Sequence, residues 1–131
     1  MAQVHSSGDS DLHLVFVYGS LKRGMANHQQ LAGAPCLGSA QLQGLRLYDL
    51  GPFPMAVESP DDAQANLQGE LYAVGSSQLA NLDRFEGVPR LYRRQRHQLA
   101  DGRAVWIYVG RPQQVRHVPA IPDGDWRGPR P

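Results

Sequence analysis

The sequence predicts an α+β protein built around a small, mostly antiparallel or mixed β-barrel with flanking helices. About six segments carry the apolar patterns of β-strands, whereas one segment has strong helical periodicity and another, shorter one is helix-like. So few helices cannot cover both faces of a parallel sheet, which argues against a doubly wound fold. A mainly antiparallel sheet, curled or closed into a barrel with helices at its side, fits both observations.

The chain has 131 residues, a length that suits one domain with a single core. We expect that domain at residues 12–126, between a disordered N-terminal tail at 1–11 and a C-terminal tail at 127–131. The first eleven residues have neither a basic start nor an apolar stretch, so they are not a secretory signal. No apolar run approaches the roughly 18 residues of a membrane span. The single cysteine, Cys36, excludes an internal disulfide, and a cytoplasmic location is expected.

The strand segments are apolar or alternating runs bounded by turn residues. The first, residues 12–18, is too rich in Val and Phe for a one-sided surface strand and reads as buried. Gly44 interrupts the alternation of a later segment, which predicts a β-bulge there. Asp101 and Gly102 predict a hairpin between the last two strands. Strands are expected at residues 12–18, 41–50, 55–57, 67–74, 91–99 and 104–109.

The clearest helix is predicted at residues 76–86, where apolar residues recur every three positions on one face. Ser76 or Ser77 can cap its start, and a glycine and a proline follow its end. A shorter helix is expected at residues 27–31, with Asn27 as its N-cap. The proline-rich segment that follows the last strand is expected to wrap the surface.

Charge is unevenly distributed although the net charge is only +1. Residues 84–131 hold ten of the thirteen basic residues and four acids, while residues 1–83 hold three bases and eight acids. The densest basic stretch runs from Arg90 to His97, and arginines beside an aromatic residue can follow a phosphate backbone. An overall charge near zero is not typical of a dedicated nucleic-acid binder. A strand with a solvated basic face is therefore favoured, and no nucleic-acid partner is expected.

The first strand ends in a loop, residues 19–24, that begins and ends with glycine. Its spacing resembles a phosphate-binding loop, but Met25 and Ala26 stand where Lys and Ser or Thr would be required, which excludes that mechanism. Gly19 can still turn the backbone so that successive amides face one anion, such as a carboxylate or phosphate. Ser20 lacks the surroundings of an activated nucleophile, so a hydrogen-bonding or backbone role is favoured.

Glu86 lies at the C-terminal end of the main helix, where the helix dipole disfavours a negative charge. Burial would disfavour it further, and both effects raise the pKa of a carboxyl group toward that of a useful general base. The alternative from position alone is an exposed glutamate paired with Arg84 or Arg90. Asp83 shares the same helix end with less reason for a catalytic role. The five histidines have no metal-ligand spacing, so neither a metal nor a cofactor is expected.

These motifs together resemble the γ-glutamylcyclotransferase-like family. The resemblance starts with residues 15–24 and continues with Asn27 and His28. Residues 51–54, 69–72, 82–87 and 91–93 then follow in the order of the family. The closest match is the γ-glutamylamine cyclotransferase branch with its bacterial relatives, over residues 14–109. The sequence after Val109 matches more loosely, although residues 124–126 resemble bacterial members.

The resemblance implies a small barrel whose mouth holds a γ-glutamyl group. It implies that the enzyme releases an amine or amino acid from a γ-glutamyl amine or peptide and forms 5-oxoproline. The family's catalytic glutamate maps onto Glu86. Tyr92 and Tyr108 either line the pocket or are core aromatics. The implied substrate-binding residues are Tyr18, Gly19, Ser20, Leu21, Tyr92 and Tyr108.

This chemistry agrees with the residues. The nucleophile is the substrate's own α-amine, so no Ser or Cys nucleophile is needed, and ring closure is intramolecular. That amine has a pKa of about 8 and is mostly protonated at neutral pH. A carboxylate at Glu86 with a raised pKa could take the proton and pass it to the leaving nitrogen. Loop amides would hold the α-carboxylate or the developing oxyanion.

Two other interpretations stay open from the sequence. One is a non-catalytic pocket protein that binds a small metabolite bearing a carboxylate. The other is a nucleic-acid or partner-binding module that uses the face from Arg90 to Arg96. For the leading interpretation we expect a small-molecule γ-glutamyl substrate, no membrane partner, and a monomer or weak homodimer.

Overall fold

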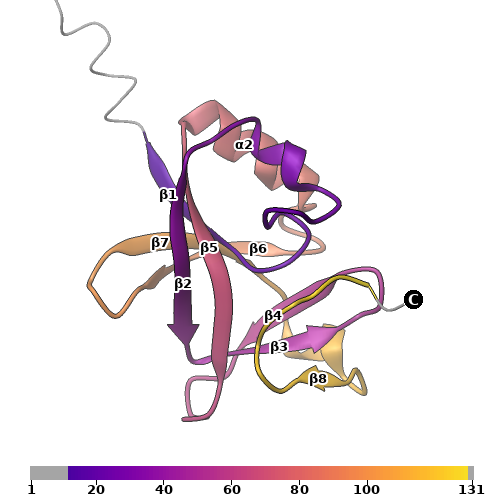
Figure 1. Ribbon diagram of the computed structural model, residues 1–131. Helices are drawn as coiled ribbons and strands as arrows, with labels where there is room; N and C mark the ends of the chain where they lie inside the picture. The colour runs from indigo at the N-terminus through magenta and orange to yellow at the C-terminus, as the bar shows by residue number, and fades with distance from the viewer. Residues whose placement is uncertain (1–11, 130–131) are drawn as a thin grey trace, which may run out of the picture.

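The computed structural model describes residues 12–129, in which the strands outnumber the helices (Figure 1). The predicted tail at residues 1–11 lies outside the described residues. Within the described range, no helix has the length and apolar character needed to cross a membrane. The elements in chain order are β1 His13–Val17, η1 His28–Leu31, β2 Cys36–Gln43, β3 Leu45–Asp49, β4 Pro54–Glu58, β5 Asn66–Val74, α2 Ser76–Phe85, β6 Arg93–Gln98, β7 Ala104–Val109, η2 Pro112–Val115 and β8 Ala120–Ile121.

The strands form two sheets. The larger has five strands in the order β2-β5-β1-β7-β6, and the smaller has three in the order β4-β3-β8. Strand pairs are antiparallel except β1 with β7, which is parallel. The structure therefore confirms a mostly antiparallel, mixed α+β fold. The closed barrel is not confirmed, because the strands of residues 12–129 are hydrogen-bonded as two separate sheets.

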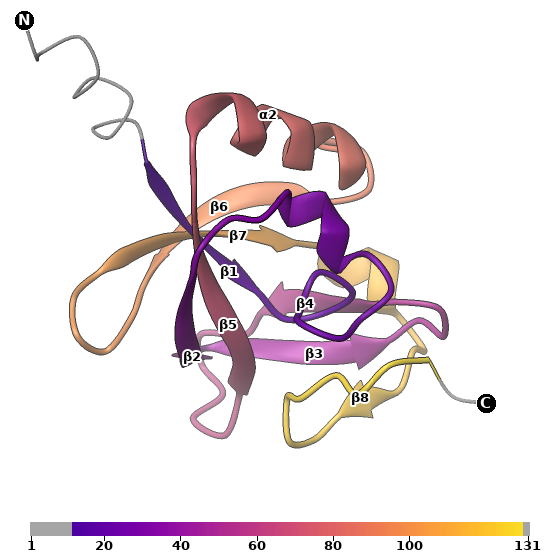
Figure 2. The ribbon, with the colours of Figure 1, turned by 45° about the horizontal axis from the view of Figure 1, so that its top comes forward.

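The central strand β1 is buried on both sides, as its continuous apolar run predicts. Val15 and Val17 belong to the core between the large sheet and α2, which lies along one side of the sheet in Figure 2. Phe16 belongs to a second core, which also contains residues of β3, β4 and the C-terminal segment. The large sheet thus separates two apolar cores, and the end of β1 is held from both faces.

The predicted single strand at residues 41–50, with a bulge at Gly44, is wrong. The chain leaves β2 at Gln43 and enters β3 at Leu45, and these strands belong to different sheets. Gly44 has φ +83°, a left-handed conformation that a glycine adopts without steric cost, so it turns the chain from one sheet to the other. The alternation slips at this position because the strand ends, and a register shift occurs instead between Cys36 and Gly38.

The structure confirms the predicted C-terminal end of the main helix but not the capping predicted at its N-terminal end. Glu86 is the C-cap residue of α2, and Gly87 follows with φ +68°. The N-cap position is occupied by Gly75 without a side-chain cap, and the hydroxyl of Ser76 lies 3.1 Å from Nε2 of His13 instead. The predicted serine cap is therefore wrong. Asn27 precedes η1, but its side chain likewise makes no cap hydrogen bond.

The C-terminal segment is attached more firmly than a surface tail. Its strand β8 pairs with β3, and the backbone oxygen of Gly124 accepts a hydrogen bond from the amide of Gln68 at 2.9 Å. The ammonium group of Lys22, which is largely buried, donates to Asp125 at 3.1 Å and to the backbone oxygen of Trp126 at 2.7 Å. These contacts connect the end of the fold to the loop after β1. No sequence signal identified β8 or η2.

Gly124 is expected to tolerate alanine less well than another glycine of similar conformation. Gly124 and Gly51 have φ values of +66° and +98°, so alanine is strained at both by about 1 kcal/mol. A Cβ at Gly124 would in addition overlap the backbone oxygen of Asn66, whereas nothing lies within 4 Å of a Cβ at Gly51. Urea unfolding should therefore show a clearly larger loss of stability for Gly124→Ala than for Gly51→Ala. Equal losses would contradict the close packing of this segment.

Candidate active site

A single pocket contains every site residue predicted from the sequence. It lies at the end of β1, and its space including the open mouth is about 350 Å³. The predicted residues in its lining are Tyr18, Gly19, Ser20, Leu21, Glu86, Tyr92 and Tyr108. Phe16, Val17, Phe53 and Pro54 also line it and were not predicted. Segments from four parts of the chain therefore meet at one cavity whose lining contains no lysine or arginine.

Gly19 is required for space rather than for an unusual backbone conformation. It is not among the residues with positive φ, so the turn after β1 does not depend on glycine for that reason. A Cβ at this position would lie 2.8 Å from Cγ of Pro54, closer than Cβ atoms pack. The absence of a side chain lets the loop approach the start of β4 and sets the width of the pocket.

In the loop that begins at Gly19, the carbonyl groups take part in hydrogen bonds, whereas the first three amides donate none within residues 12–129. The amides of Gly19, Ser20 and Leu21 donate no hydrogen bond to any residue in the range 12–129. The carbonyl oxygens accept hydrogen bonds from the amide of Lys22 (3.0 Å, to Gly19) and the amide of Asn27 (2.9 Å, to Ser20), and that of Leu21 lies 2.9 Å from Nδ1 of His28. Successive unpaired amides suit a bound anion.

Two polar side chains support the loop from outside the pocket. The side-chain amide of Asn27 donates to the hydroxyl of Ser20 at 2.9 Å, which fits a hydrogen-bonding role for that serine. Glu70 accepts hydrogen bonds from the amide of Arg23 at 2.9 Å and from the hydroxyl of Tyr72 at 2.8 Å. No sequence signal identified this support of the loop by Glu70.

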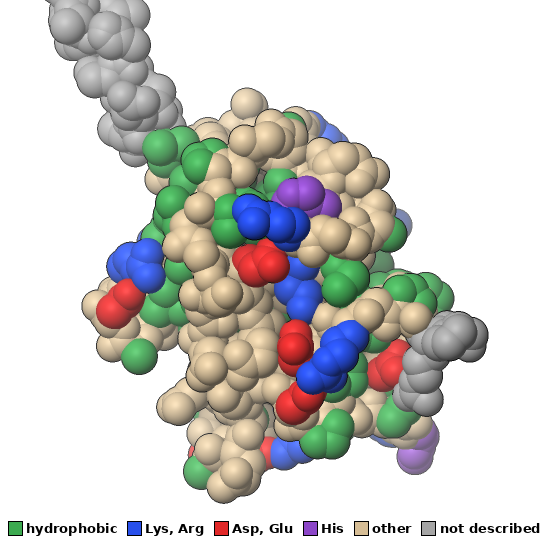
Figure 3. All heavy atoms as spheres, in the orientation of Figure 1, with side chains coloured by type: hydrophobic (Ala, Val, Ile, Leu, Met, Phe, Trp, Pro, Cys, Tyr) green, Lys and Arg blue, Asp and Glu red, His purple; other side chains and the backbone are tan. Residues whose placement is uncertain are grey.

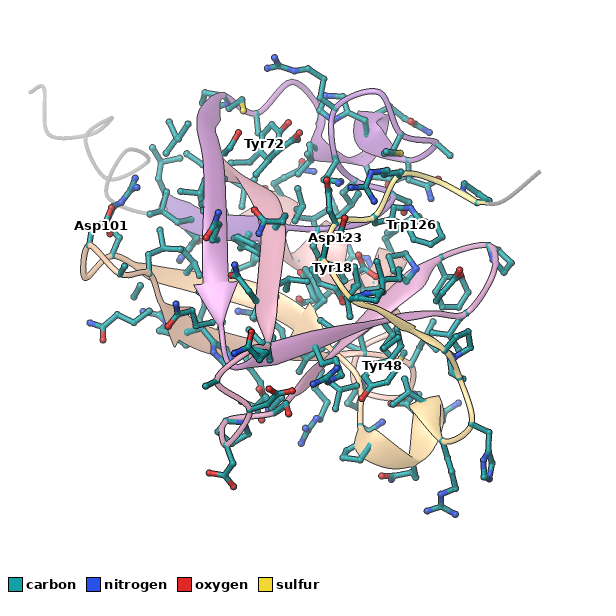
Figure 4. All side chains as sticks on the ribbon, turned by 60° about the horizontal axis from the view of Figure 1, so that its bottom comes forward. Tyr18, Tyr48, Tyr72, Asp101, Asp123 and Trp126 are labelled. Atoms are coloured by element: carbon teal, nitrogen blue, oxygen red, sulfur yellow. The ribbon has the colours of Figure 1, made fainter. Side chains whose placement is uncertain are left out.

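Tyr18 is buried in the middle of the molecule, as Figure 4 shows. Its hydroxyl donates to the backbone oxygen of Tyr108 at 2.6 Å and accepts from the amide of Ala56 at 3.1 Å. The hydroxyl of Tyr92 donates to the backbone oxygen of Pro54 at 2.7 Å. Burial raises the pKa of Tyr18 and of Tyr92 well above the ordinary value, so both phenols stay protonated at neutral pH.

The third tyrosine is held by an ion pair. The hydroxyl of Tyr108 donates to Oδ1 of Asp83 at 2.8 Å, and Nε of Arg94 donates to the same oxygen at 2.7 Å. Burial, followed by the hydrogen bond to Asp83, raises the pKa of Tyr108. Asp83 therefore connects the helix end that carries Glu86 to strands β6 and β7. The spacing of Asp83 and Arg94 in the sequence gave no signal of this contact.

Glu86 is directed toward the pocket and not into a surface ion pair. Among residues 12–129 it makes no salt bridge, and Arg84, one of the partners considered from the sequence, bonds to Asn81 instead. Burial raises the pKa of the Glu86 carboxyl from 4.5 to about 7. A group with this pKa exchanges protons readily near neutral pH, which is the property that a general acid/base requires.

The arginine-rich strand β6 uses part of its charge within the protein. Arg94 pairs with Asp83, and the guanidinium groups of Arg94 and Arg96 each lie 4.2 Å from the ring centre of Trp106. On the face drawn in Figure 3, basic and acidic side chains lie next to one another.

Residues 12–129 contain no group of three or more His, Cys, Asp or Glu side chains suited to a metal ion.

The fold and the pocket define an α+β protein with one carboxyl group beside a loop of free amides. A family model described as gamma-glutamyl cyclotransferase, AIG2-like, matches residues 15–128. The chain therefore belongs to this family of enzymes, which confirms the resemblance found in the sequence.

Individual relatives agree with this assignment. The Escherichia coli K12 gamma-glutamylcyclotransferase family protein YtfP is 34% identical over 112 residues, which cover 86% of this chain and 94% of that protein. The human gamma-glutamylaminecyclotransferase is 39% identical over 102 residues, covering 70% of this chain and 65% of the human protein. The crystal structure of a mouse AIG2-like protein superposes with a TM-score of 0.69 at 23% identity, over 91% of this chain and 97% of that one. This likeness shows the shared fold.

The raised pKa of Glu86 should make folding stability fall as pH rises. Between about pH 4.5 and 7 the folded protein binds more protons at this carboxyl than the unfolded chain does. The free-energy cost of ionising Glu86 in the folded protein is absent below about pH 4.5 and reaches at most about 3 kcal/mol above pH 7. Glu86→Gln should therefore gain stability over the wild type at pH 8 but not at pH 4 in urea unfolding. Asp61→Asn, at an exposed carboxyl, is the control; the same pH profile for both variants would contradict the burial of Glu86.

Proposed function

We propose that the protein is a γ-glutamyl cyclotransferase that releases an amine or amino acid from a γ-glutamyl amine or peptide and forms 5-oxoproline. The observation that carries the proposal is that one pocket is lined both by Glu86, whose carboxyl pKa is raised, and by Gly19, Ser20 and Leu21, whose amides donate to no residue in the range 12–129. The names of the Escherichia coli and human relatives support the same class of reaction.

In this proposal the loop amides hold the negative end of the substrate. No lysine or arginine lines the pocket, so the α-carboxylate of a γ-glutamyl group has to be matched by backbone N–H groups. The amides of Gly19, Ser20 and Leu21 are available for this purpose. The buried tyrosine hydroxyls are already bonded to backbone oxygens or to Asp83 and serve to hold the pocket walls.

The reaction requires two protons to leave the α-ammonium nitrogen, and the leaving nitrogen gains two as it becomes an ammonium group. The carboxylate of Glu86 takes a proton from the α-ammonium group, and the freed amine attacks the γ-carbonyl carbon to form the ring C–N bond. The bond between that carbon and the leaving nitrogen then breaks as Glu86 returns the proton to this nitrogen. The ring nitrogen loses its second proton to water, and the released amine takes up one proton from water. Glu86 ends as it began, and the step involves no oxidation or reduction. Ring closure within a held substrate supplies a large part of the rate.

The direct test is to incubate the protein with γ-glutamyl-ε-lysine and a panel of γ-glutamyl amino acids and amines, and to measure 5-oxoproline. Wild-type protein should release it from at least one member. Glu86→Gln should lower kcat/KM by about 10²- to 10⁴-fold, because the proton transfer is lost while binding remains. Asp61→Asn should retain full activity. Ligand binding without turnover on the whole panel would favour the non-catalytic pocket protein, and full activity of Glu86→Gln would refute the role of Glu86.

The same role predicts the pH dependence of the reaction. Because Glu86 must be ionised to accept a proton and its pKa is about 7, kcat/KM should decline as pH falls below that value. A pH profile measured from pH 5 to 8 should give an apparent pKa near 7 on its acidic side. A kcat/KM that stays constant down to pH 5 would show that burial does not tune this group.

A further inference from the structure

A second groove adjoins the proposed site and shares Glu86 with it. Its space including the open mouth is about 460 Å³, larger than the about 350 Å³ of the pocket. It shares Ser20, Phe53, Glu86 and Tyr92 with the pocket, and Asn27, Phe85 and Leu91 complete its lining. The two spaces therefore adjoin each other beside the carboxyl group.

The groove is apolar where it opens to solvent. Phe85 and Leu91 have exposed fractions of 38% and 41% and belong to the four large apolar side chains that are exposed in residues 12–129. The turn after α2 holds them together, since the amide of Leu91 donates to the backbone oxygen of Gly87 at 2.9 Å. Two exposed apolar side chains beside a reactive group indicate a surface that binds apolar ligand atoms.

The position of the groove determines what can occupy it. In the proposed function, on which this inference rests, Glu86 returns its proton to the leaving nitrogen. Glu86 lines both the pocket and the groove, so a substituent on the nitrogen that Glu86 protonates can extend into the groove when the glutamyl group fills the pocket. Apart from Glu86, the lining carries no charged side chain, so a charged substituent would find no partner.

We infer that Phe85 and Leu91 form a leaving-group subsite that selects γ-glutamyl amides of amines with an apolar alkyl or aryl substituent. Each methylene group that enters the groove loses contact with water. Full burial of a methylene group corresponds to about fourfold in binding, and a groove open on one side should give about twofold. The inner pocket recognises the glutamyl group and the outer groove recognises the amine.

The test compares γ-glutamyl amides of methylamine, butylamine and hexylamine as substrates of one enzyme preparation. The ratio of kcat/KM for the hexyl amide to that for the methyl amide should be about tenfold or more in the wild type. Phe85→Ser and Leu91→Ser should each reduce this ratio toward one, since they remove an apolar wall. Leu37→Ser, at an equally exposed leucine on β2, should keep the wild-type ratio.

The outcomes separate this inference from the proposed function. Turnover of all three amides with no dependence on chain length would overturn the subsite and leave the cyclotransferase intact. If none of the three amides is turned over while another member of the γ-glutamyl panel is, the subsite is overturned and the cyclotransferase stands. If nothing on the whole panel is turned over, the proposed function fails, and calorimetric binding of the three amides to Glu86→Gln still tests the groove: equal affinities overturn it. Concentration-dependent dimerisation that Phe85→Ser and Leu91→Ser both abolish, without any chain-length dependence, would assign the apolar surface to a second copy of the chain instead.

Discussion

The hydroxyl group of Tyr18 joins the two sheets of the protein by buried hydrogen bonds to both of them. It donates to a backbone oxygen of β7 in the large sheet and accepts from a backbone amide of β4 in the small sheet. Because both contacts are buried, loss of the hydroxyl would leave backbone groups without partners, which is costly. The pocket lies at this junction, so its shape depends on both sheets keeping their positions.

The polar groups of the pocket are of two kinds, those that are hydrogen-bonded within the protein and those that are not. The tyrosine hydroxyls and the loop carbonyls are all hydrogen-bonded, whereas the Glu86 carboxyl and the loop amides have no protein partner in the described part of the chain. A half-buried carboxyl without a cation to pair with is energetically unfavourable when ionised. The rigid surroundings tolerate this cost, and a γ-glutamyl substrate would supply the missing partners with its ammonium and carboxylate groups.

Local signals in the sequence were sufficient to predict the parts of the site that lie at the end of a helix or a strand. Glu86 at a helix end and the loop that Gly19 begins after a buried strand were both identified, as was the helix itself. Contacts between distant segments could not be identified, because spacing along the chain does not encode them. The ion pair of Asp83 with Arg94 and the attachment of Lys22 to Asp125 are of this kind. Gly44 was misread for a related reason, since a bulge and a turn between sheets interrupt an alternating pattern in the same way.

The position of β1 in the middle of the large sheet has a consequence for how the protein folds. Val15 pairs with Tyr72 on one side and with Trp106 on the other, so both neighbours of the first strand come from much later in the chain. Pairings between distant segments form slowly, on the order of milliseconds to seconds in small domains rich in them. During synthesis, the cavity that the first strand and its loop form with β7 cannot exist until β7 has been made. The site therefore exists only when the first strand has paired with segments from the second half of the chain.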